Sequence, residues 1–382
     1  MSFEVETLCD AIDKMMRKHL PPQEVRRRDA TADPPDYLLK IFADMGLFHL
    51  ALPKSEGGLG VGWQAMSVIQ ERLGYHATMA ALLYNRVTCF GVMTLLTSAS
   101  QALKEYWLPK LLAGEGAFAL ALSESAAGSD AGALQTRAEP LGSNWKLNGR
   151  KIWISGASSA LRMVVAARTT AQSRGGEGVT LFMVAPDALG VEMTQLKKVG
   201  NHCSLSYDIG FHDVVIPDTE RIGPIGAGFD CLKKTLFYAR SGLASAVVGT
   251  GQAAVDEALV HAKARQQFGR PIGAFQALSH RLAQMQTDVD LARLITRELA
   301  RHIDEGIGAD RLAAQAKLVA TETLKRVTEH GMQIMASAGY AAESDMQRFW
   351  RDARLYSFGE GSSEILLDLI AADLGVGRRL AK

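Results

Sequence analysis

Cysteine is scarce and scattered in this chain. Its four cysteines are Cys9, Cys89, Cys203 and Cys231, and no two of them have C-x-x-C spacing. Such separation argues against a zinc site or a disulfide framework, and reduced thiols inside a cell are the simpler interpretation. We therefore expect no metal centre.

An excess of charge of one sign is also missing. Lys and Arg together number 42 against 41 Asp and Glu, which leaves a formal net charge of +1. Nucleic acids and anionic membranes attract clustered positive charge, so this balance favours neither partner. Three basic residues near the C-terminus, Arg378, Arg379 and Lys382, leave nucleic-acid binding open as a non-enzymatic alternative.

Long apolar runs and targeting signals are absent too. We find no stretch of about 18 apolar residues of the kind that spans a membrane. The N-terminal sequence MSFEVETLCD is acidic and mixed, unlike a secretory signal or an Arg-rich transit peptide. We expect a cytoplasmic protein without a membrane segment.

The composition that remains favours a large, mainly helical protein. The 382 residues are 47% hydrophobic but only 7% aromatic, and a chain of this length divides into two or three domains. Helical patterns interrupted by Pro and Gly fill residues 1–115, short strand-like runs fill 116–225, and helical patterns return over 226–382. The sequence thus predicts an α+β protein with a β-domain between two helical domains.

The middle domain is expected to be a β-barrel or sandwich. Residues 145–147 and 151–154 are predicted to form a hairpin around Asn148-Gly149. Further strands are predicted over residues 162–167, 179–184, 206–209 and 214–216. In the last domain, Leu278, Leu282, Met285, Val289 and Leu299 recur at helical spacing, which predicts a four-helix bundle.

Four motifs follow one another along the chain. They are LALSESAAGSD (120–130), KIWISG (151–156), RQQFGRPIGAFQ (265–276) and RDARLYSFGEGSSEI (351–365), the last preceded by QIMASAGY (333–340). In this order and over nearly the whole chain, they resemble the FAD-dependent acyl-CoA dehydrogenase family. The resemblance implies an α–β–α architecture, bound FAD, and a homodimer or homotetramer.

The first two motifs supply small and hydroxyl-bearing residues suited to a flavin. A loop of this kind presents backbone N–H groups without bulky side chains, although an ordinary strand-to-loop turn is the alternative. Trp153 and Ser155 lie two positions apart and share one face of a strand. The resemblance implies that Trp153 packs on the flavin ring and Ser155 bonds flavin N5; Trp153 could instead be a core aromatic. It also implies FAD contacts from Leu120, Leu122, Ser123, Gly128 and Ser129, the last of which also touches substrate.

The third motif places an arginine beside an aromatic and an amide. A guanidinium suits a pyrophosphate because its planar fork donates two charge-assisted hydrogen bonds. By resemblance, Arg265, Phe268 and Gln276 contact the FAD of a neighbouring subunit, and Gln333, Ser337 and Gly339 meet its adenosine half. Cofactor binding would then require assembly.

The fourth motif contains the candidate base, Glu360, between Gly359 and Gly361. Burial can raise the pKa of a carboxylate until it removes the weakly acidic α-proton of a thioester. The resemblance implies this role for Glu360, with hydride passing to flavin N5 and a trans-2-enoyl-CoA as product. A solvated Glu in a glycine turn is the alternative.

Neighbouring residues complete this prediction. The resemblance places Gly361 at the substrate and Ser362 and Glu364 at the cofactor, and Glu364 is the rival carboxylate. Some relatives carry the base on the helix after the β-domain, but no Glu lies between Phe237 and Gly251.

Substrate contacts are expected from Arg240, Tyr84 and Arg86. Arg240 could equally be an internal salt-bridge partner, and Arg86 could either pair with a polar acyl tail or point to solvent. Gly359 stands where the family often has Tyr, which predicts a wider acyl cavity.

The resemblance leaves the final electron acceptor open. An electron-transfer flavoprotein is expected, whereas an acyl-CoA oxidase would pass electrons to oxygen. A flavin monooxygenase of the same fold usually lacks the glutamate, so Glu360 argues against that alternative.

Overall fold

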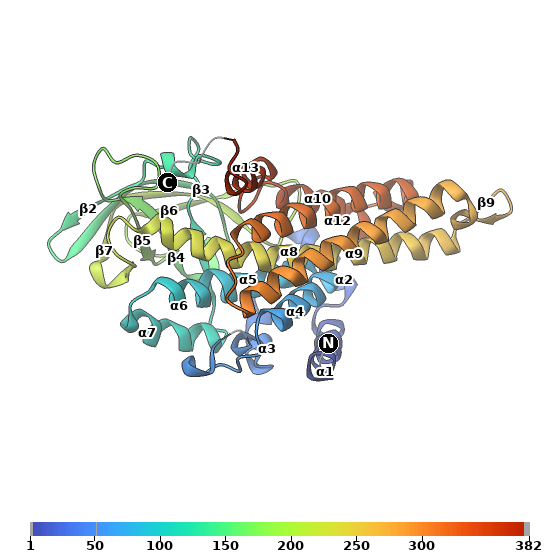
Figure 1. Cartoon of the computed structure of the whole chain (residues 1–382), viewed down its shortest axis with the longest axis horizontal. Helices are drawn as coiled ribbons and strands as arrows, with labels where there is room; N and C mark the ends of the chain where they lie inside the picture. Colours follow the sequence, from blue (N-terminus) through green and yellow to red (C-terminus); the bar gives the residue numbers. More distant parts are fainter. Residues whose placement is uncertain (1–2, 51, 378–382) are drawn as a thin grey trace.

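Helices at both ends of the chain surround a β-sheet region, and a pair of long helices projects away from the sheet (Figure 1). The computed structural model describes residues 3–50 and 52–377. The basic residues Arg378, Arg379 and Lys382 therefore lie outside the described residues.

The N-terminal region is helical as far as Leu112. Pro22 opens one helix at its first turn, where a missing N–H costs nothing. The elements are α1 (Phe3–His19), α2 (Pro22–Thr31), α3 (Leu38–Asp44), η1 (Leu47–His49), η2 (Lys54–Glu56), α4 (Trp63–His76), α5 (Thr78–Asn85), the π-helical η3 (Arg86–Met93), α6 (Thr94–Ser98) and α7 (Gln101–Leu112).

One helical stretch in this region, Thr78–Ser98, is long and apolar enough to span a membrane by length and composition alone. Our sequence reading did not identify it. In the fold, 83% of its apolar window is buried inside the protein. The apolar character of this stretch is therefore explained by its place in the core.

The middle region is one eight-stranded sheet. Its order is β6-β7-β3-β2-β4-β5-β8, with β1 pairing in parallel with β4. The elements are β1 (Ala117–Ala121), η4 (Ala131–Ala133), β2 (Arg137–Leu141), β3 (Asn144–Ser155), η5 (Ala157–Ser159), β4 (Ala160–Arg168), β5 (Val179–Val184), β6 (Val191–Leu196), β7 (Ser206–Pro217), η6 (Asp218–Glu220) and β8 (Arg221–Ile222).

The central strands are covered on both faces. In β4, Val164 and Ala166 join the core shared with the N-terminal helices, while Met163 and Val165 join a second core on the opposite face. Burial on both faces explains why these strands are continuous apolar runs without alternation.

The predicted hairpin at Asn148-Gly149 is wrong. Residues 144–155 form the single strand β3, whose register with β7 shifts between Leu147 and Gly149. Gly149 has a φ of +148°, and a Cβ there would lie 2.6 Å from the Thr136 Cα. The glycine therefore serves a bulge and a close strand contact.

The C-terminal region is a helical bundle with a small hairpin at its far end. The predicted apolar stripe lies in its core, where Met285, Val289 and Leu299 are fully buried. The elements are α8 (Gly228–Ala264), β9 (Gln266–Gln267), β10 (Arg270–Pro271), η7 (Ile272–Ala274), α9 (Gln276–Asp304), α10 (Asp310–Met335), α11 (Ser337–Tyr340), α12 (Asp345–Tyr356) and α13 (Ser363–Asp373).

An ion pair and a hydrogen bond to a carboxylate join the three regions around the RDAR sequence (351–354). Arg351 of α12 pairs with Asp29 of α2 at 2.6 Å. The next residue, Asp352, accepts a 2.5 Å hydrogen bond from the backbone N–H of Asn201, in the loop before β7. One helix turn thus fixes the N-terminal and middle regions against the bundle.

Glycines allow α4 and α8 to pack with their backbones in contact. A Cβ on Gly249 of α8 would overlap the carbonyl oxygen of Glu71 in α4. Reciprocally, a Cβ on Gly74 of α4 would overlap the carbonyl oxygen of Ala246. No side chain stands between the two helices at this crossing, so neither position tolerates a methyl group without backbone movement.

Gly249→Ala should lower the free energy of unfolding by about 1–3 kcal/mol because it overpacks this crossing. Gly251→Ala is the matched control on the same helix, since its Cβ would meet Val289 Cγ2 at an ordinary 3.4 Å. The control should be neutral or gain up to about 1 kcal/mol from helix propensity. Denaturant unfolding of both variants tests this, and equal stability of the two would contradict the packing argument.

Candidate functional site

Glu360 lies in the turn between α12 and α13. Gly359 N donates to the Leu355 carbonyl at 2.9 Å, which ends the preceding helix. Ser362 caps the next helix by accepting from Ile365 N at 3.3 Å. Between these two ends, Glu360 adopts a φ of +57° and Gly361 a φ of +105°.

The Glu360 carboxyl group is enclosed although the residue as a whole is partly exposed. Its Oε2 is buried and has no hydrogen-bond partner among the described residues. Burial raises the pKa of Glu360 to about 7, against the opposing charges of Lys317 and Arg240. A carboxylate that exchanges a proton near neutral pH is suited to general acid–base work.

A half-buried arginine and a fully buried lysine hold the backbone of this turn. Arg240 of α8 donates from Nε to the Glu360 carbonyl at 3.1 Å. Lys317 of α10 donates from Nζ to the Gly361 carbonyl at 2.7 Å. The structure thus brings Arg240 to the backbone of the predicted base.

Lys317 was missed by our sequence reasoning. It is fully buried, on the same helix face as Ala313, Ala320 and Leu324. A lysine at an apolar position of an amphipathic helix was the available signal, because a buried lysine is rare unless paired.

The rival carboxylate, Glu364, has a different environment. It is exposed in the first turn of α13, where its own backbone N–H and the Ser362 hydroxyl lower its pKa. A carboxylate stabilised in its ionised form at a helix N-terminus is a helix-capping group and a weak base.

A buried ion pair supports the loop of the first motif. Lys151 is fully buried and donates from Nζ to the Leu122 carbonyl at 2.9 Å and to Glu124 Oε1 at 2.7 Å. Glu124 also accepts from the backbone of Gln135 and Thr136 at 2.7 and 3.0 Å. Lys151 and Glu124 both lie inside the motifs, but the sequence analysis did not identify them as an ion pair. Neither lies in a regular hydrophobic pattern, which would have indicated that its charge is buried.

This loop and β3 form a surface of small and hydroxyl-bearing residues. Ser129 is exposed, and a Cβ on the exposed Gly128 would meet nothing within 4 Å. Trp153 is 55% exposed at a φ of +64°, so it is not a core aromatic. The Ser155 hydroxyl lies 3.1 Å from that of Ser206. Exposed aromatic, hydroxyl and open backbone groups fit the flat, polar-edged flavin that the motifs imply.

The remaining cofactor candidates of the first motif sit beside this surface. Leu120 and Leu122 are half-buried against the N-terminal core. Ser123 uses its carbonyl to accept from Ile152 N at 2.9 Å, which joins the two motifs. Ser125 and Ala126 lie in a turn closed by reciprocal backbone bonds between Glu124 and Ala127.

The expected substrate contacts of Arg86 and Tyr84 need correction. Arg86 donates to the carbonyls of Gly156 and Phe118 at 2.8 and 3.3 Å, so it ties η3 to the sheet. Tyr84 is fully buried, and its hydroxyl donates to the Leu47 carbonyl at 2.8 Å. Tyr84 is thus engaged within the N-terminal region and Arg86 between that region and the sheet, because a buried polar group needs a local partner.

A second group of predicted cofactor residues is exposed. Arg265 ends α8, Gln276 begins α9, and Phe268 is 92% exposed in the β9–β10 hairpin at the far end of these helices (Figure 1). Gln333 and Ser337 are exposed near the end of α10, whereas Gly339 is buried against Met335. The hairpin lies at the opposite end of the molecule from the sheet and its flavin-facing motifs.

Strained backbone coincides with these sites. Among the described residues, eight non-glycine residues have a positive φ, and three of them are Trp153, Phe268 and Glu360. A fourth, Ala336, directly precedes Ser337 and has a φ of +51° and ψ of −131°. Such conformations cost free energy and concentrate where function requires them.

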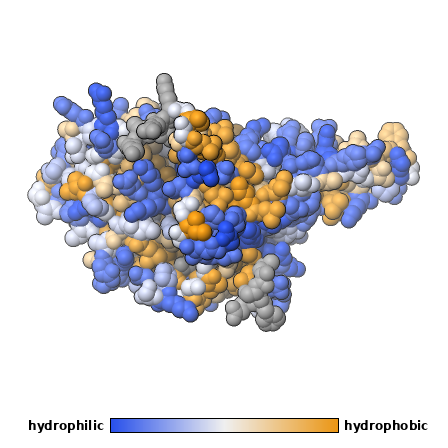
Figure 2. Space-filling model, viewed as in Figure 1, coloured by the Kyte–Doolittle hydropathy of each residue, from blue (hydrophilic) through white to orange (hydrophobic). Residues whose placement is uncertain are grey.

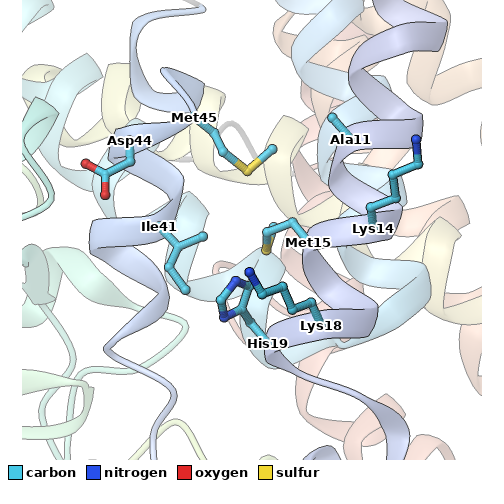
Figure 3. A pocket seen from close by; sticks show the side chains of 8 residues that line it. All are labelled: Ala11, Lys14, Met15, Lys18, His19, Ile41, Asp44 and Met45. Atoms are coloured by element: carbon cyan, nitrogen blue, oxygen red, sulfur yellow. The ribbon is translucent and has the colours of Figure 1, made fainter.

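A surface groove between α1 and α3 is unrelated to these residues (Figure 3). Figure 3 shows Lys14, Lys18 and His19 on one side and Ile41, Asp44 and Met45 on the other. No predicted site residue lines it, so this open groove carries no part of the chemistry.

Comparison with known proteins gives matches over nearly the whole chain. The N-terminal, middle and C-terminal domains of acyl-CoA dehydrogenases match residues 2–115, 119–214 and 226–375. A 3-(aryl)acrylate reductase of Clostridium sporogenes is 34% identical over 97% of this chain and 94% of its own length. A glutaryl-CoA dehydrogenase of Desulfococcus multivorans is 32% identical over 98% of both chains.

Two further matches concern partners and ligands. A subunit of the caffeyl-CoA reductase–Etf complex of Acetobacterium woodii is 32% identical over 91% of this chain and 92% of its own length. A solved glutaryl-CoA dehydrogenase in complex with glutaryl-CoA superimposes with a TM-score of 0.93 at 30% identity, covering 99% of this chain and 96% of that one. Because all three domains and the whole fold match, the chain belongs to the acyl-CoA dehydrogenase family of FAD-dependent oxidoreductases.

Proposed function

We propose that the protein oxidises the Cα–Cβ bond of an acyl-CoA thioester, with Glu360 removing the α-proton. The observation that carries this proposal is the buried Glu360 Oε2, which lacks a hydrogen-bond partner and has a pKa of about 7. The proton moves to this oxygen, and FAD, when bound, supplies the hydride acceptor. The base becomes neutral as it accepts the proton, which suits a poorly solvated site.

The turn also offers polarising groups to the thioester. The backbone carbonyls of Glu360 and Gly361 are occupied by Arg240 and Lys317. The two positive charges are therefore fixed beside the proposed base, and fixed charges in a dry site stabilise negative charge that develops on a thioester bound there.

Glu360→Gln should abolish anaerobic bleaching of the flavin by acyl-CoA, because the amide cannot accept the α-proton. Loss of a general base costs about 10²–10⁴-fold in rate. Glu364→Gln is the matched test of the rival carboxylate and should bleach as the native protein does. Stopped-flow absorbance with a panel of straight, branched, aryl and dicarboxylic acyl-CoAs measures the rate and the substrate class together. Bleaching that survives in Glu360→Gln would refute this role.

The acid limb of kcat/KM should lie near pH 7. Glu360 acts as a base only when ionised, and burial raises its pKa to about 7, so the rate should rise as the pH increases through this value. An exposed glutamate would instead give a limb near its usual pKa of about 4.3. Initial rates from pH 5 to 9 with one active thioester, corrected for unfolding, test this. A rate that is flat above pH 5.5 would contradict it.

The reverse reaction is a second candidate function. Two similar relatives are named reductases of aryl-substituted unsaturated acids or thioesters. In that direction the enoyl group receives a hydride at Cβ, and protonated Glu360 returns its proton to Cα. The glycine at position 359, next to Glu360, supports this proposal because it has no side chain that would narrow an acyl cavity. Anaerobic reoxidation of the reduced protein by an aryl-enoyl-CoA, without bleaching by any saturated thioester, would favour this direction.

The proposed electron partner is an electron-transfer flavoprotein, supported by the relative from the caffeyl-CoA reductase–Etf complex. An oxidase would pass electrons directly to oxygen. Peroxide formation at the rate of turnover in air would favour the oxidase, whereas slow reoxidation in air favours the flavoprotein partner.

We further propose that two copies share each FAD site. The β9–β10 hairpin is far from the flavin-facing sheet, yet Phe268 is both strained and 92% exposed there. The view in Figure 2 shows apolar surface gathered over the C-terminal helices, where exposed leucines include Leu291, Leu294 and Leu367. Exposed apolar patches of this kind mark association surfaces.

Arg265→Ala should weaken FAD binding about 10- to 100-fold by removing a charge-assisted hydrogen bond across the interface. Lys263→Ala removes an exposed cation from the same helix and is the control, with unchanged affinity. Flavin fluorescence titration gives the affinity, and light scattering gives the oligomeric state. A monomer that binds FAD tightly would contradict the shared site.

A further inference from the structure

The turn that carries Glu360 needs support from outside. Glu360 has a left-handed backbone at a φ of +57°, and the next residue continues with a φ of +105°. For a residue with a Cβ, this conformation costs roughly 1–2 kcal/mol relative to the right-handed region. Glycine would adopt this left-handed conformation without that cost. A glutamate at position 360 is therefore present although its backbone conformation favours glycine.

The two carbonyls of this strained pair are held by different helices. Arg240 donates to the Glu360 carbonyl from α8, and Lys317 donates to the Gly361 carbonyl from α10. A Cβ on Gly361 would lie 3.2 Å from Arg240 Nη2, so the guanidinium packs directly against this residue. The direction of the Glu360 side chain is therefore fixed from two sides.

Lys317 is the less expected of the two supports. Its side chain is fully buried, and its hydrogen bond within the described residues goes to a neutral carbonyl, Gly361 O. A buried ammonium is costly without an opposite charge nearby. The charged groups that act on it are Glu360, Arg240, Glu322 and Glu364. The charges of Lys317 and Arg240 act in turn on Glu360, and the charge of Glu360 acts on the buried Cys89 of η3.

We propose that Lys317 is a positioning residue for the reaction, acting on Glu360 through the Gly361 carbonyl. This inference rests on the proposed function. The bond fixes the turn so that the carboxylate stays over the substrate carbon. The ammonium also favours the ionised form of Glu360, which is the form that accepts the proton; the pKa of Lys317 itself is lowered to about 8 by burial.

Lys317→Met tests the proposal because it keeps the buried volume and removes both bond and charge. We expect flavin reduction to slow by about 10- to 100-fold, the range for a hydrogen bond to a charged group. We also expect the acid limb of the pH profile to move to higher pH, because the cation that opposes burial of the Glu360 carboxylate is lost. Arg326→Met is the matched control, since it removes an exposed cation from the same helix.

Lys317→Gln separates the two effects and covers the case in which Lys317→Met fails to fold. It retains a donor for the Gly361 carbonyl without the charge, so the rate should partly recover while the acid limb stays displaced. FAD content and circular dichroism establish that each variant is folded. The proposal is overturned if the acid limb of both folded variants lies at the same pH as in the native protein. If Lys317→Met does not fold, the same result for Lys317→Gln alone overturns it. If the native protein bleaches with no thioester in either direction, the proposed function fails instead.

Discussion

The proposed chemistry of this protein depends on keeping one carboxylate, that of Glu360, ionisable in a place with little water. Burial pushes the pKa of Glu360 upward, and the charges of Lys317 and Arg240 limit the rise to about 7. Neither cation bonds the carboxylate itself among the described contacts; both bond the backbone on either side of it. A direct ion pair would have made the group a weak base, so the indirect arrangement combines support with reactivity.

The rest of the fold places the two cations and the flavin-facing surface around this turn. Helix α8 carries Arg240, and its backbone touches α4 at Gly249. The η3 segment lies between α8 and the sheet: Arg86 at its start bonds carbonyls of the sheet region, and Cys89 donates to the Tyr238 carbonyl of α8 at 3.4 Å. Irregular helical turns of the π type often occur at functional sites, and this one links α8, which carries Arg240, to the sheet region.

Turns and exposed strands were harder to predict than the helices. The stripe from Leu282 to Leu299 predicted α9 because a helix of period 3.6 buries every third or fourth residue. The turn predicted at Asn148-Gly149 failed because glycine there serves a strand bulge, and local sequence does not distinguish the two. The strands that were not predicted include β2 (Arg137–Leu141) and β6 (Val191–Leu196), which lack a buried apolar run.

By itself, the sequence determined the family, the order of helical and sheet regions, and the candidate base. Motifs and hydrophobic periodicity involve residues that are close together along the chain, so they can be recognised without the fold. Only the tertiary structure decided that Tyr84 and Arg86 bond backbone carbonyls inside the fold and that Lys317 reaches the turn of Glu360. It also decided that Lys151 pairs with Glu124 beneath the first motif. These contacts join residues distant along the chain, and the electrostatic state of a buried group depends on which charges the fold brings near it.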